Sequence, residues 1–217
     1  MNKKRLILIG GGGHCKVVIS IIKKLKNFEI VGVIDNYKVG DSVYGIRVIG
    51  SDENLEDFYK ESIRYALITI GSVKDNTKRR DLFKMGRKIG YEFPVIISPQ
   101  AIVDDSVEIA EGTVIMPGCI VNIASTIGKN TIINTGATID HDCKIGNHSH
   151  IAPGVHISGG VEVGDLSFIG IGSTIIQGVK IGKNATIGAG SVVIKDIPDN
   201  VVVVGNPARE IKTEKNE

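Results

Sequence analysis

A six-residue repeat between Val103 and Val193 restricts the possible fold more than any other feature of this sequence. Every sixth residue of this stretch is Ile or Val, and the phase never slips. The residue two places before each of them is small, as at Ala137 and Ser149. A short period held over so long a stretch is typical of stacked coils, and a period of six predicts a β-helix.

The residue types of the repeat suit a narrow prism. A β-branched aliphatic residue favours a short strand and points into the interior, while the small residue fits near a corner, where the interior tapers. Gly or Asn after the aliphatic residue suits a tight turn. Three hexads would form one triangular coil of about 18 residues, so we expect about five coils with no inserted loop. Cys119 and Cys143 occupy the small position and are expected to be buried.

The composition restricts the partners and the compartment. The formal net charge of +2 argues against a nucleic-acid or membrane partner. The apolar run Leu6–Ile9 is too short for a signal peptide or a transmembrane span, and it leads straight into glycines. The three cysteines show no pairing pattern, and an odd count suits a reducing compartment. We therefore expect a cytoplasmic protein.

The N-terminal part has the order strand, glycine turn, helix, strand. Arg5–Ile9 is predicted to be a buried strand, and Gly10–Gly13 follow without interruption. His14–Lys26 has the apolar spacing of a helix, and Glu29–Ile34 is a second strand that ends in Asp35. This order opens a Rossmann-like unit, in which glycines let a phosphate approach the backbone and the helix N-terminus favours the anion.

The glycine run departs from the dinucleotide-binding fingerprint. Gly10 and Gly12 fit its first two glycine positions, whereas Cys15 stands at the third. Two interpretations are open: a phosphate site, or a tight turn without a ligand. Asp35 likewise could contact a ribose hydroxyl or only begin a turn. The few strands before the repeat favour a mononucleotide over a dinucleotide.

The remaining segments complete the predicted domain organisation. Ser51 is expected to cap a helix that runs to about Lys60. Further predicted elements are a strand over 65–70, a helix over 75–89 whose Lys78, Arg79 and Arg80 face solvent, a strand over 94–97, a last strand over 201–204 and a frayed tail from Lys212. We therefore expect a Rossmann-like domain over residues 1–98 and a repeat domain over residues 99–217.

His141 is the first candidate for catalysis. It falls in the polar class of repeat positions, two places after an aliphatic residue, so we expect it to face outward near a corner of the prism. Asp140 and Asp142 flank it. An acid beside a histidine can hold one tautomer and raise the basicity of the imidazole, which a general base needs. A solvated surface histidine is the alternative interpretation.

His148 and His150 raise the possibility of a metal site. They alternate along the chain and share a face if the strand is regular, as a zinc-binding pair would. The sequence lacks a third ligand at the long spacing of the gamma-class carbonic anhydrases, and no metal is expected. No Ser-His-Asp or Cys-His pattern stands out either. Direct attack by a bound acceptor, with a histidine base, is the simpler chemistry.

Several short motifs identify a family when they are taken together. They are Gly10-Gly11-Gly12-Gly13-His14, Asp35-Asn36-Tyr37-Lys38, Ile70-Gly71, the hexads, Asn134-Thr135, Asp140-His141-Asp142-Cys143, Ser149-His150 and Val204-Gly205-Asn206-Pro207-Ala208. Over nearly the whole chain they resemble the bacterial acyltransferases that make N-acetylated amino sugars on nucleotide carriers. The bacillosamine-type and perosamine-type N-acetyltransferases are examples, and the sialic-acid O-acetyltransferases are similar as well.

The resemblance implies a homotrimer of left-handed parallel β-helices, each with a Rossmann-like domain that holds the nucleotide-linked amino sugar. Acetyl-CoA would lie between adjacent β-helices, and the cytoplasmic enzyme would serve polysaccharide biosynthesis. By the same resemblance, His141 is the general base and Asp142 orients it. The other residues that match family contacts are Gly12, Gly13, His14, Asp35, Lys38, Gly71 and Asn134 for the nucleotide sugar, and His150, Gly159, Ile171 and Ala189 for acetyl-CoA.

The sequence departs from the family pattern at two places. Asn36 stands where close relatives carry a second acid, and Ser98 stands where many members carry histidine. The first departure leaves the nucleobase open among uracil, thymine and guanine. The expected reaction is N-acetylation of a 4-amino-4,6-dideoxyhexose type of sugar. The alternatives are a sialic-acid O-acetyltransferase, a non-catalytic nucleotide-binding trimer and a zinc hydratase.

Overall fold

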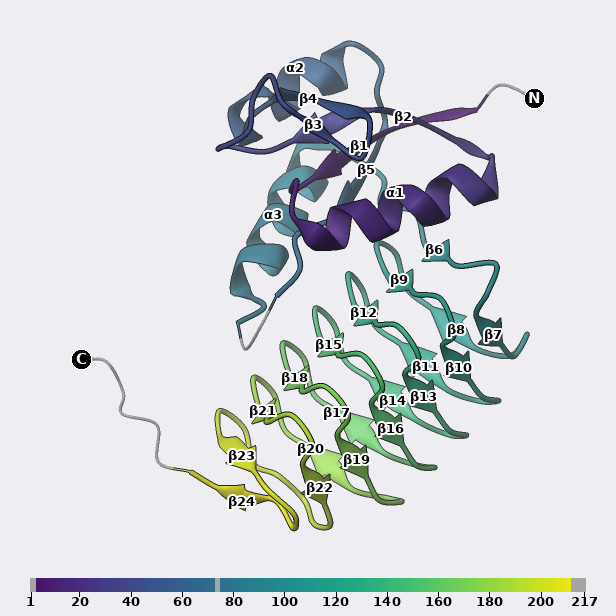
Figure 1. Ribbon diagram of the computed structural model, residues 1–217, viewed down its shortest axis with the longest axis vertical. Coiled ribbons are helices and arrows are strands. Elements are labelled where there is room, and N and C mark those ends of the chain that lie inside the picture. The colour runs from purple at the N-terminus through teal and green to yellow at the C-terminus, as the bar shows by residue number, and fades with distance from the viewer. Residues whose placement is uncertain (1–2, 73–74, 212–217) are drawn as a thin grey trace.

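The computed structural model describes residues 3–72 and 75–211 and contains two units (Figure 1). An α/β domain is followed by a long stack of coils. The tail from Lys212, which was predicted to be frayed, lies outside the described residues. Within the described ranges, no helix is both long enough and apolar enough to cross a membrane.

The N-terminal domain is built on a five-stranded sheet with the order β3-β4-β2-β1-β5. The strands are β1 (Lys4–Ile9), β2 (Phe28–Ile34), β3 (Ser42–Val43), β4 (Ile46–Gly50) and β5 (Tyr65–Ile68). All neighbouring strands are parallel except β3 and β4, which form a hairpin. The predicted Rossmann-like unit is therefore present, and the hairpin is an addition that the sequence analysis missed.

Helices cover both faces of this sheet. Helix α1 (Gly13–Leu25) lies on the face toward the coils (Figure 1). The short 3-10 helix η1 (Asp52–Asn54), α2 (Leu55–Lys60) and α3 (Thr77–Ile89) lie beyond it in the chain, and residues of α2 and α3 share a second core with the opposite face of the sheet. Ser51 caps η1 through a capping box with Asn54, so the predicted N-cap is confirmed although the first turn is 3-10.

The C-terminal unit is a parallel β-helix with three sheets along its sides. The first sheet has the order β22-β19-β16-β13-β10-β7, the second β20-β17-β14-β11-β8, and the third β24-β23-β21-β18-β15-β12-β9-β6. The strands are β6 (Ile96–Ile97), β7 (Ile102–Val103), β8 (Glu108–Ile109), β9 (Val114–Ile115), β10 (Ile120–Val121), β11 (Thr126–Ile127), β12 (Ile132–Ile133), β13 (Thr138–Ile139), β14 (Lys144–Ile145), β15 (His150–Ile151), β16 (His156–Ile157), β17 (Glu162–Val163), β18 (Phe168–Ile169), β19 (Thr174–Ile175), β20 (Lys180–Ile181), β21 (Thr186–Ile187), β22 (Val192–Val193), β23 (Val202–Val204) and β24 (Arg209–Glu210).

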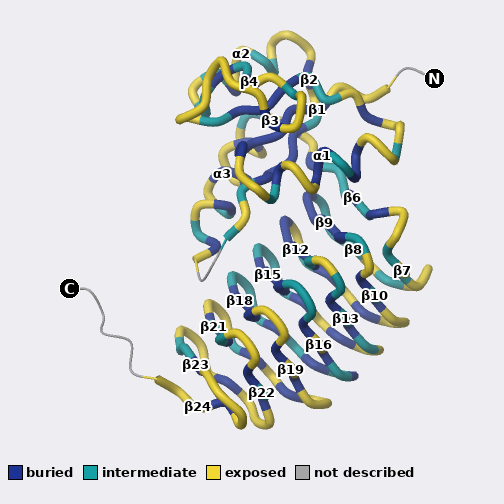
Figure 2. The backbone as a smooth tube through the Cα atoms, in the orientation of Figure 1, coloured by how far each residue is buried: buried dark blue, intermediate teal, exposed yellow. Residues whose placement is uncertain are grey.

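The register of the β-helix is the one that the hexads predict. Thr138 pairs with Ile120 on one side and His156 on the other, each 18 positions away. Strands recur every six residues from β7 to β22, so no loop interrupts these coils. The aliphatic and small positions line the interior, which appears as the buried band in Figure 2, and Cys119 and Cys143 are fully buried as expected.

The two units share one hydrophobic core. Apolar residues of α1, including Cys15 and Val18, belong to the same buried cluster as Met116 and the interior of the coils. Ile96–Ile97 pairs with β9, so the sheets of the β-helix begin before residue 99, the predicted start of the repeat domain. This shared packing holds the Rossmann-like domain over the third sheet.

Candidate active site

A cavity of about 350 Å³ lies where the two units meet. The strand order reverses between β1 and β5, and ligands of open parallel sheets bind beyond the carboxyl ends of the strands at such a switch point. The loops after β1 and β5 line one side, and β12, β15 and β18 with their turns line the other. The lining residues are Gly13, His14, Val17, Gly71, Ser72, Met116, Asn134, His150, Ala152, Pro153, Phe168 and Ile171.

The fold requires glycine at one position of the glycine turn, whereas two other positions face open space. Gly10 has a φ of +109°, and a Cβ there would lie 2.3 Å from Ile70, so no other residue fits. A Cβ on Gly12 or Gly13 would meet nothing within 4 Å. Helix α1 begins at Gly13 and has no acidic residue in its first turn. The open space in front of free backbone N–H groups suits an anion such as a phosphate.

Side chains of the turn after β2 form hydrogen bonds with the backbone of this glycine turn. The carboxylate of Asp35 accepts the Gly11 N–H at 2.7 Å, and the Lys38 Nζ donates to the Gly11 carbonyl at 2.8 Å. Asp35 also accepts the N–H of Tyr37. The structure therefore shows Asp35 and Lys38, predicted as nucleotide contacts, holding the backbone of the glycine turn at Gly11.

His150 has a defined tautomer at the floor of the cavity. Its Nδ1 lies 2.9 Å from the backbone carbonyl of Ser72, which can only accept, so Nδ1 carries the proton. Its Nε2 then accepts from the Asn134 side-chain amide at 3.0 Å. Burial, reinforced by the charge of Arg79, lowers the pKa of His150 to about 4. The imidazole is therefore neutral at physiological pH.

His14 brings an unpaired polar atom to the same cavity. Its Nε2 is buried, and this atom has no hydrogen-bond partner within the described part of the chain. Burial first, then the charges of Arg79 and His150, hold the pKa of His14 well below its usual range. An unpaired buried polar atom costs about 1–3 kcal/mol, so a ligand that supplied the missing partner would gain from it.

Arg79 corrects the expectation of a solvated basic run. It is 1% exposed and lies with Leu82, Phe83 and Gly86 on the buried side of α3. Its guanidinium donates to the carbonyls of β5 and its following loop, and to the Asn130 side chain at 2.9 Å across the domain junction. Burial lowers its pKa to about 9. The helical spacing of these four residues was the signal that could have revealed it.

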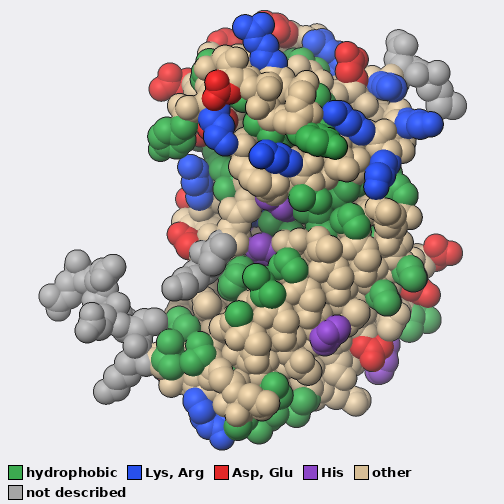
Figure 3. Space-filling model, in the orientation of Figure 1, with side chains coloured by type: hydrophobic (Ala, Val, Ile, Leu, Met, Phe, Trp, Pro, Cys, Tyr) green, Lys and Arg blue, Asp and Glu red, His purple; other side chains and the backbone are tan. Residues whose placement is uncertain are grey.

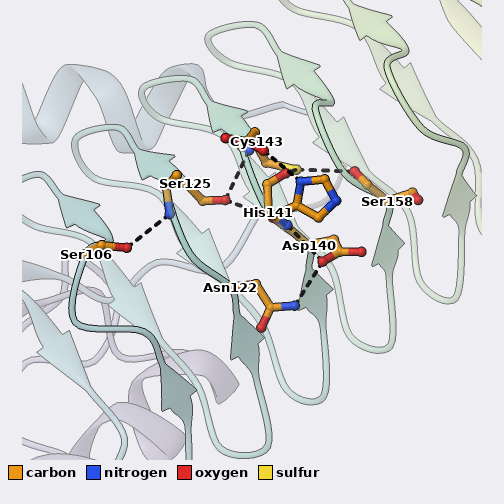
Figure 4. Close-up of polar contacts among 9 residues, drawn as sticks. Ser106, Asn122, Ser125, Asp140, His141, Cys143 and Ser158 are labelled. Atoms are coloured by element: carbon orange, nitrogen blue, oxygen red, sulfur yellow. Dashed lines mark hydrogen bonds and ion pairs between the residues drawn. The ribbon is translucent and has the colours of Figure 1, made fainter.

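His141 lies at another corner of the prism, on the turn after β13 (Figure 4). Its Nδ1 is 2.7 Å from the carboxylate of Asp142, and Asp140 accepts the His141 backbone N–H at 2.9 Å. Asp140 also accepts from the side chain of Asn122. The hydrogen bond that His141 donates to Asp142 first, and then the charge of Asp140, raise the pKa of His141. Nδ1 is thus committed as a donor, and Nε2 can accept a proton.

The structure divides most of the predicted site residues between two places, while Gly12, Asp35 and Lys38 lie at the glycine turn and do not line the cavity. Gly13, His14, Gly71, Asn134, His150 and Ile171 meet at the cavity. His141, Asp142 and Gly159 lie at the outward corner after the first sheet, and Ala189 lies one coil beyond Ile171 at the equivalent turn. On the face in Figure 3, histidine atoms are accordingly visible both in the seam below the Rossmann-like domain and beside acidic side chains lower down.

The two histidines considered for a metal have other partners. The Nδ1 of His148 lies 3.0 Å from the Asn130 amide, and its ring packs edge-on against Phe83. His150 is bonded to Ser72 and Asn134 as described above. Across residues 3–72 and 75–211, no three His, Cys, Asp or Glu residues gather as a group that could hold a metal ion.

Two sequence families match the chain. The family of the PglD N-terminal domain matches residues 5–85. The bacterial transferase hexapeptide family, with six repeats, matches residues 124–159 and 160–195. Among curated proteins, no match is found.

Solved structures match nearly the whole chain. The acetyltransferase domain of PglB from Neisseria gonorrhoeae FA1090 is 36% identical, with 96% of this chain and 100% of that chain covered and a TM-score of 0.91. PerB from Caulobacter crescentus, in complex with CoA and GDP-perosamine, is 37% identical, with coverage of 95% and 97% and a TM-score of 0.90. WeeI from Acinetobacter baumannii AYE is 29% identical, with coverage of 95% and 99% and a TM-score of 0.83.

This chain belongs to the bacterial nucleotide-sugar N-acetyltransferase family. The family of acyltransferases that the sequence motifs resembled is thereby confirmed. The predicted fold class is confirmed as well, since a Rossmann-like parallel domain precedes a left-handed parallel β-helix of hexapeptide repeats.

Proposed function

We propose that the protein transfers the acetyl group of acetyl-CoA to the amino group of a nucleotide-linked amino sugar. The observation that carries this proposal is the end-to-end match to PerB, whose structure contains both CoA and GDP-perosamine. The PglB domain, equally similar, has been solved with acetyl coenzyme A. The sugar is of the 4-amino-4,6-dideoxyhexose type, and its nucleotide lies on the glycine turn at the switch-point cavity.

The chemistry is a direct transfer. The neutral amine of the sugar attacks the thioester carbonyl, and its N–H proton passes to Nε2 of His141 as the C–N bond forms. The C–S bond then breaks, and CoA leaves as the thiol after taking up a proton. Asp142 fixes the tautomer of His141 and stabilises its protonated form. The hydrogen-bonded pair Asn134 and His150 orients the ligands from the cavity side.

The division of the site between two corners supports a homotrimer. His141 and the switch-point cavity lie on different edges of one prism, so a single copy does not bring the base to the bound sugar. Packing the corner of one β-helix against the cavity side of the next joins the two halves. The same contact partly desolvates His141, whose side chain is 47% exposed in one chain. We place this enzyme in the cytoplasm, in polysaccharide biosynthesis.

A thiol-release assay tests the proposal. The protein is incubated with acetyl-CoA and a panel of UDP-, dTDP- and GDP-linked amino sugars, with the matching hydroxy sugars as controls and free sialic acids as alternative acceptors. Turnover that requires the amino group supports N-acetylation. Turnover on sialic acids instead would identify an O-acetyltransferase, and binding of nucleotide sugars without turnover would identify a non-catalytic trimer. Light scattering at the assay concentration checks the trimer, and a monomer there would contradict this assembly.

A further inference from the structure

Gly159 lies directly under the imidazole of His141. A Cβ built on Gly159 would be 2.5 Å from both Cε1 and Nε2 of His141, and 3.1 Å from Cδ2. Carbon atoms of side chains do not approach so closely, so any side chain at Gly159 would displace the ring. The Nε2 edge of the ring therefore occupies the space that a side chain on Gly159 would fill.

The backbone at this position does not require glycine. Gly159 is outside the left-handed region of φ, whereas its neighbour Gly160 has a φ of +67° and needs it. Successive coils place Ile123, His141, Gln177 and Lys195 at the equivalent corner position, so every neighbouring coil carries a side chain there. Space for the imidazole is what distinguishes this coil.

The surrounding ladder keeps the two residues in register. The Gly160 N–H donates to the carbonyl of His141 at 2.9 Å, and the Gly178 N–H donates to the carbonyl of Gly159 at 3.0 Å. The backbone is thus held on both sides, while the histidine ring can rotate about its own bonds. A methyl group at Gly159 would be accommodated by movement of the ring and not by movement of the coil.

We propose that Gly159 is a positioning residue for the general base. Because Gly159 has no side chain, the His141 ring can lie against its own β-helix, with Nδ1 hydrogen-bonded to Asp142 and Nε2 open to accept a proton. We call this space beside Gly159 the seat of the ring. This inference rests on the proposed function only for its kinetic consequence, since the seat itself is a property of the folded chain. It also differs from the cofactor contact that the family resemblance implies for Gly159.

Gly159→Ala tests the seat without depending on turnover. The protonation of His141 can be followed by NMR of its imidazole signals, assigned with His141→Ala. In the wild type the hydrogen bond that His141 donates to Asp142 raises the pKa of His141. In Gly159→Ala the displaced ring loses that bond, and we expect its pKa to fall toward the ordinary value of about 6.5. An unchanged pKa in a folded variant would overturn the proposal.

Kinetics then separate this role from a cofactor contact. If the wild type acetylates an amino sugar, Gly159→Ala should lower kcat by about 10- to 100-fold, because small misplacement of a base is costly. In a His141→Ala background the same change should alter kcat by less than about twofold, because the seat acts only through the ring. A raised KM for acetyl-CoA with normal kcat would instead indicate a cofactor contact and would contradict the proposal that Gly159 positions the His141 ring. If the wild type shows no turnover, the proposed function is wrong, and the NMR measurement alone then decides whether Gly159 positions the His141 ring.

Discussion

At the scale of single residues, His141 and His156 show how local partners distinguish two imidazoles of one β-helix. His156, on β16, has its Nδ1 2.9 Å from the hydroxyl of Thr138. His141 has the carboxylate of Asp142 at 2.7 Å and a second acid, Asp140, beside it. A carboxylate favours the protonated ring and fixes the tautomer, whereas a hydroxyl adds no charge. His156 is therefore the matched control for His141.

Replacing His141 should remove the base and leave binding intact. We expect His141→Ala to lower kcat by about 10²–10⁴-fold with little change in KM for acetyl-CoA, since a positioned base acts mainly in the transition state. His156→Ala should retain near-normal kcat. Steady-state kinetics on both variants, with assembly checked by light scattering, decides the assignment. Near-normal kcat for His141→Ala would mean that water or the acceptor carries the proton.

Replacing Asp142 should move the pH dependence. The base works in its neutral form, so kcat rises as the pH passes upward through the pKa of His141, which Asp142 raises. Asp142→Ala should lower that pKa, and the acid limb of the kcat profile should shift to lower pH. The plateau should fall by less than in His141→Ala, because the ring remains. A limb that stays in place would show that Asp142 does not set the basicity of His141.

At the scale of elements, the β1–α1 turn separates two kinds of glycine. Gly10 is needed by the fold because of its positive φ and its contact with Ile70. Gly12, the N-cap of α1, has empty space where a side chain would project. A side chain at Gly12 would thus fill the place proposed for the phosphate and leave the packing of the domain unchanged.

Gly12→Val should therefore weaken nucleotide-sugar binding alone. Isothermal titration with a nucleotide amino sugar should show a loss of about tenfold or more, because the backbone N–H groups are shielded from the phosphate. Acetyl-CoA affinity and the thermal midpoint should stay near those of the wild type. Equal loss of both ligands in a folded trimer would contradict the assignment of the two ligands to different sites.

The local sequence pattern predicted the strands of the hexads but not the β3–β4 hairpin. Each strand of the coil is specified by its own six residues, so the repeat alone gave the strands, the register and the outward phase of His141. The hairpin of β3 and β4 was missed because β3 has only two residues, Ser42–Val43, too few for a periodicity. Its turn was not recognisable either, because Tyr44 and Gly45 both have positive φ although Tyr-Gly is not one of the dipeptides that signal such a turn. The two-residue strand β24 was missed for the same reason as β3.

At the scale of the whole molecule, the junction between the domains determines what the sequence could not predict. The burial of His14, the tautomer of His150 and the position of Arg79 all depend on how the Rossmann-like domain packs on the third sheet. No local pattern encodes that packing, because its contacts join residues far apart in the chain. Arg79 and Asn130, which bond across the junction, are 51 positions apart.

The same junction should make stability depend on pH. His150 has a pKa of about 4 when folded against an ordinary value near 6.5, and His14 is shifted in the same direction by burial, Arg79 and His150 itself. Unfolded chains then bind more protons than folded ones between about pH 4 and 6.5, so the free energy of unfolding falls as the pH drops through this window. Each fully buried imidazole contributes at most about 1.4 kcal/mol per pH unit.

Urea unfolding at fixed protein concentration measures this slope. The comparison is best made between pH 5 and 6.5, because the carboxylates whose pKa is lowered, Asp81, Asp104 and Asp140, stay ionised there. The variant His150→Gln keeps an amide that can donate to the Ser72 carbonyl but cannot titrate. The dependence of its free energy of unfolding on pH should therefore be shallower than that of the wild type by the contribution of about one imidazole. The variant leaves the Arg79–Asn130 hydrogen bond across the junction unchanged, so the packing of the two domains should be preserved. An identical slope in the variant would mean that His150 is not buried in its neutral form, and the packing of the two domains over the cavity would then have to differ from the one described.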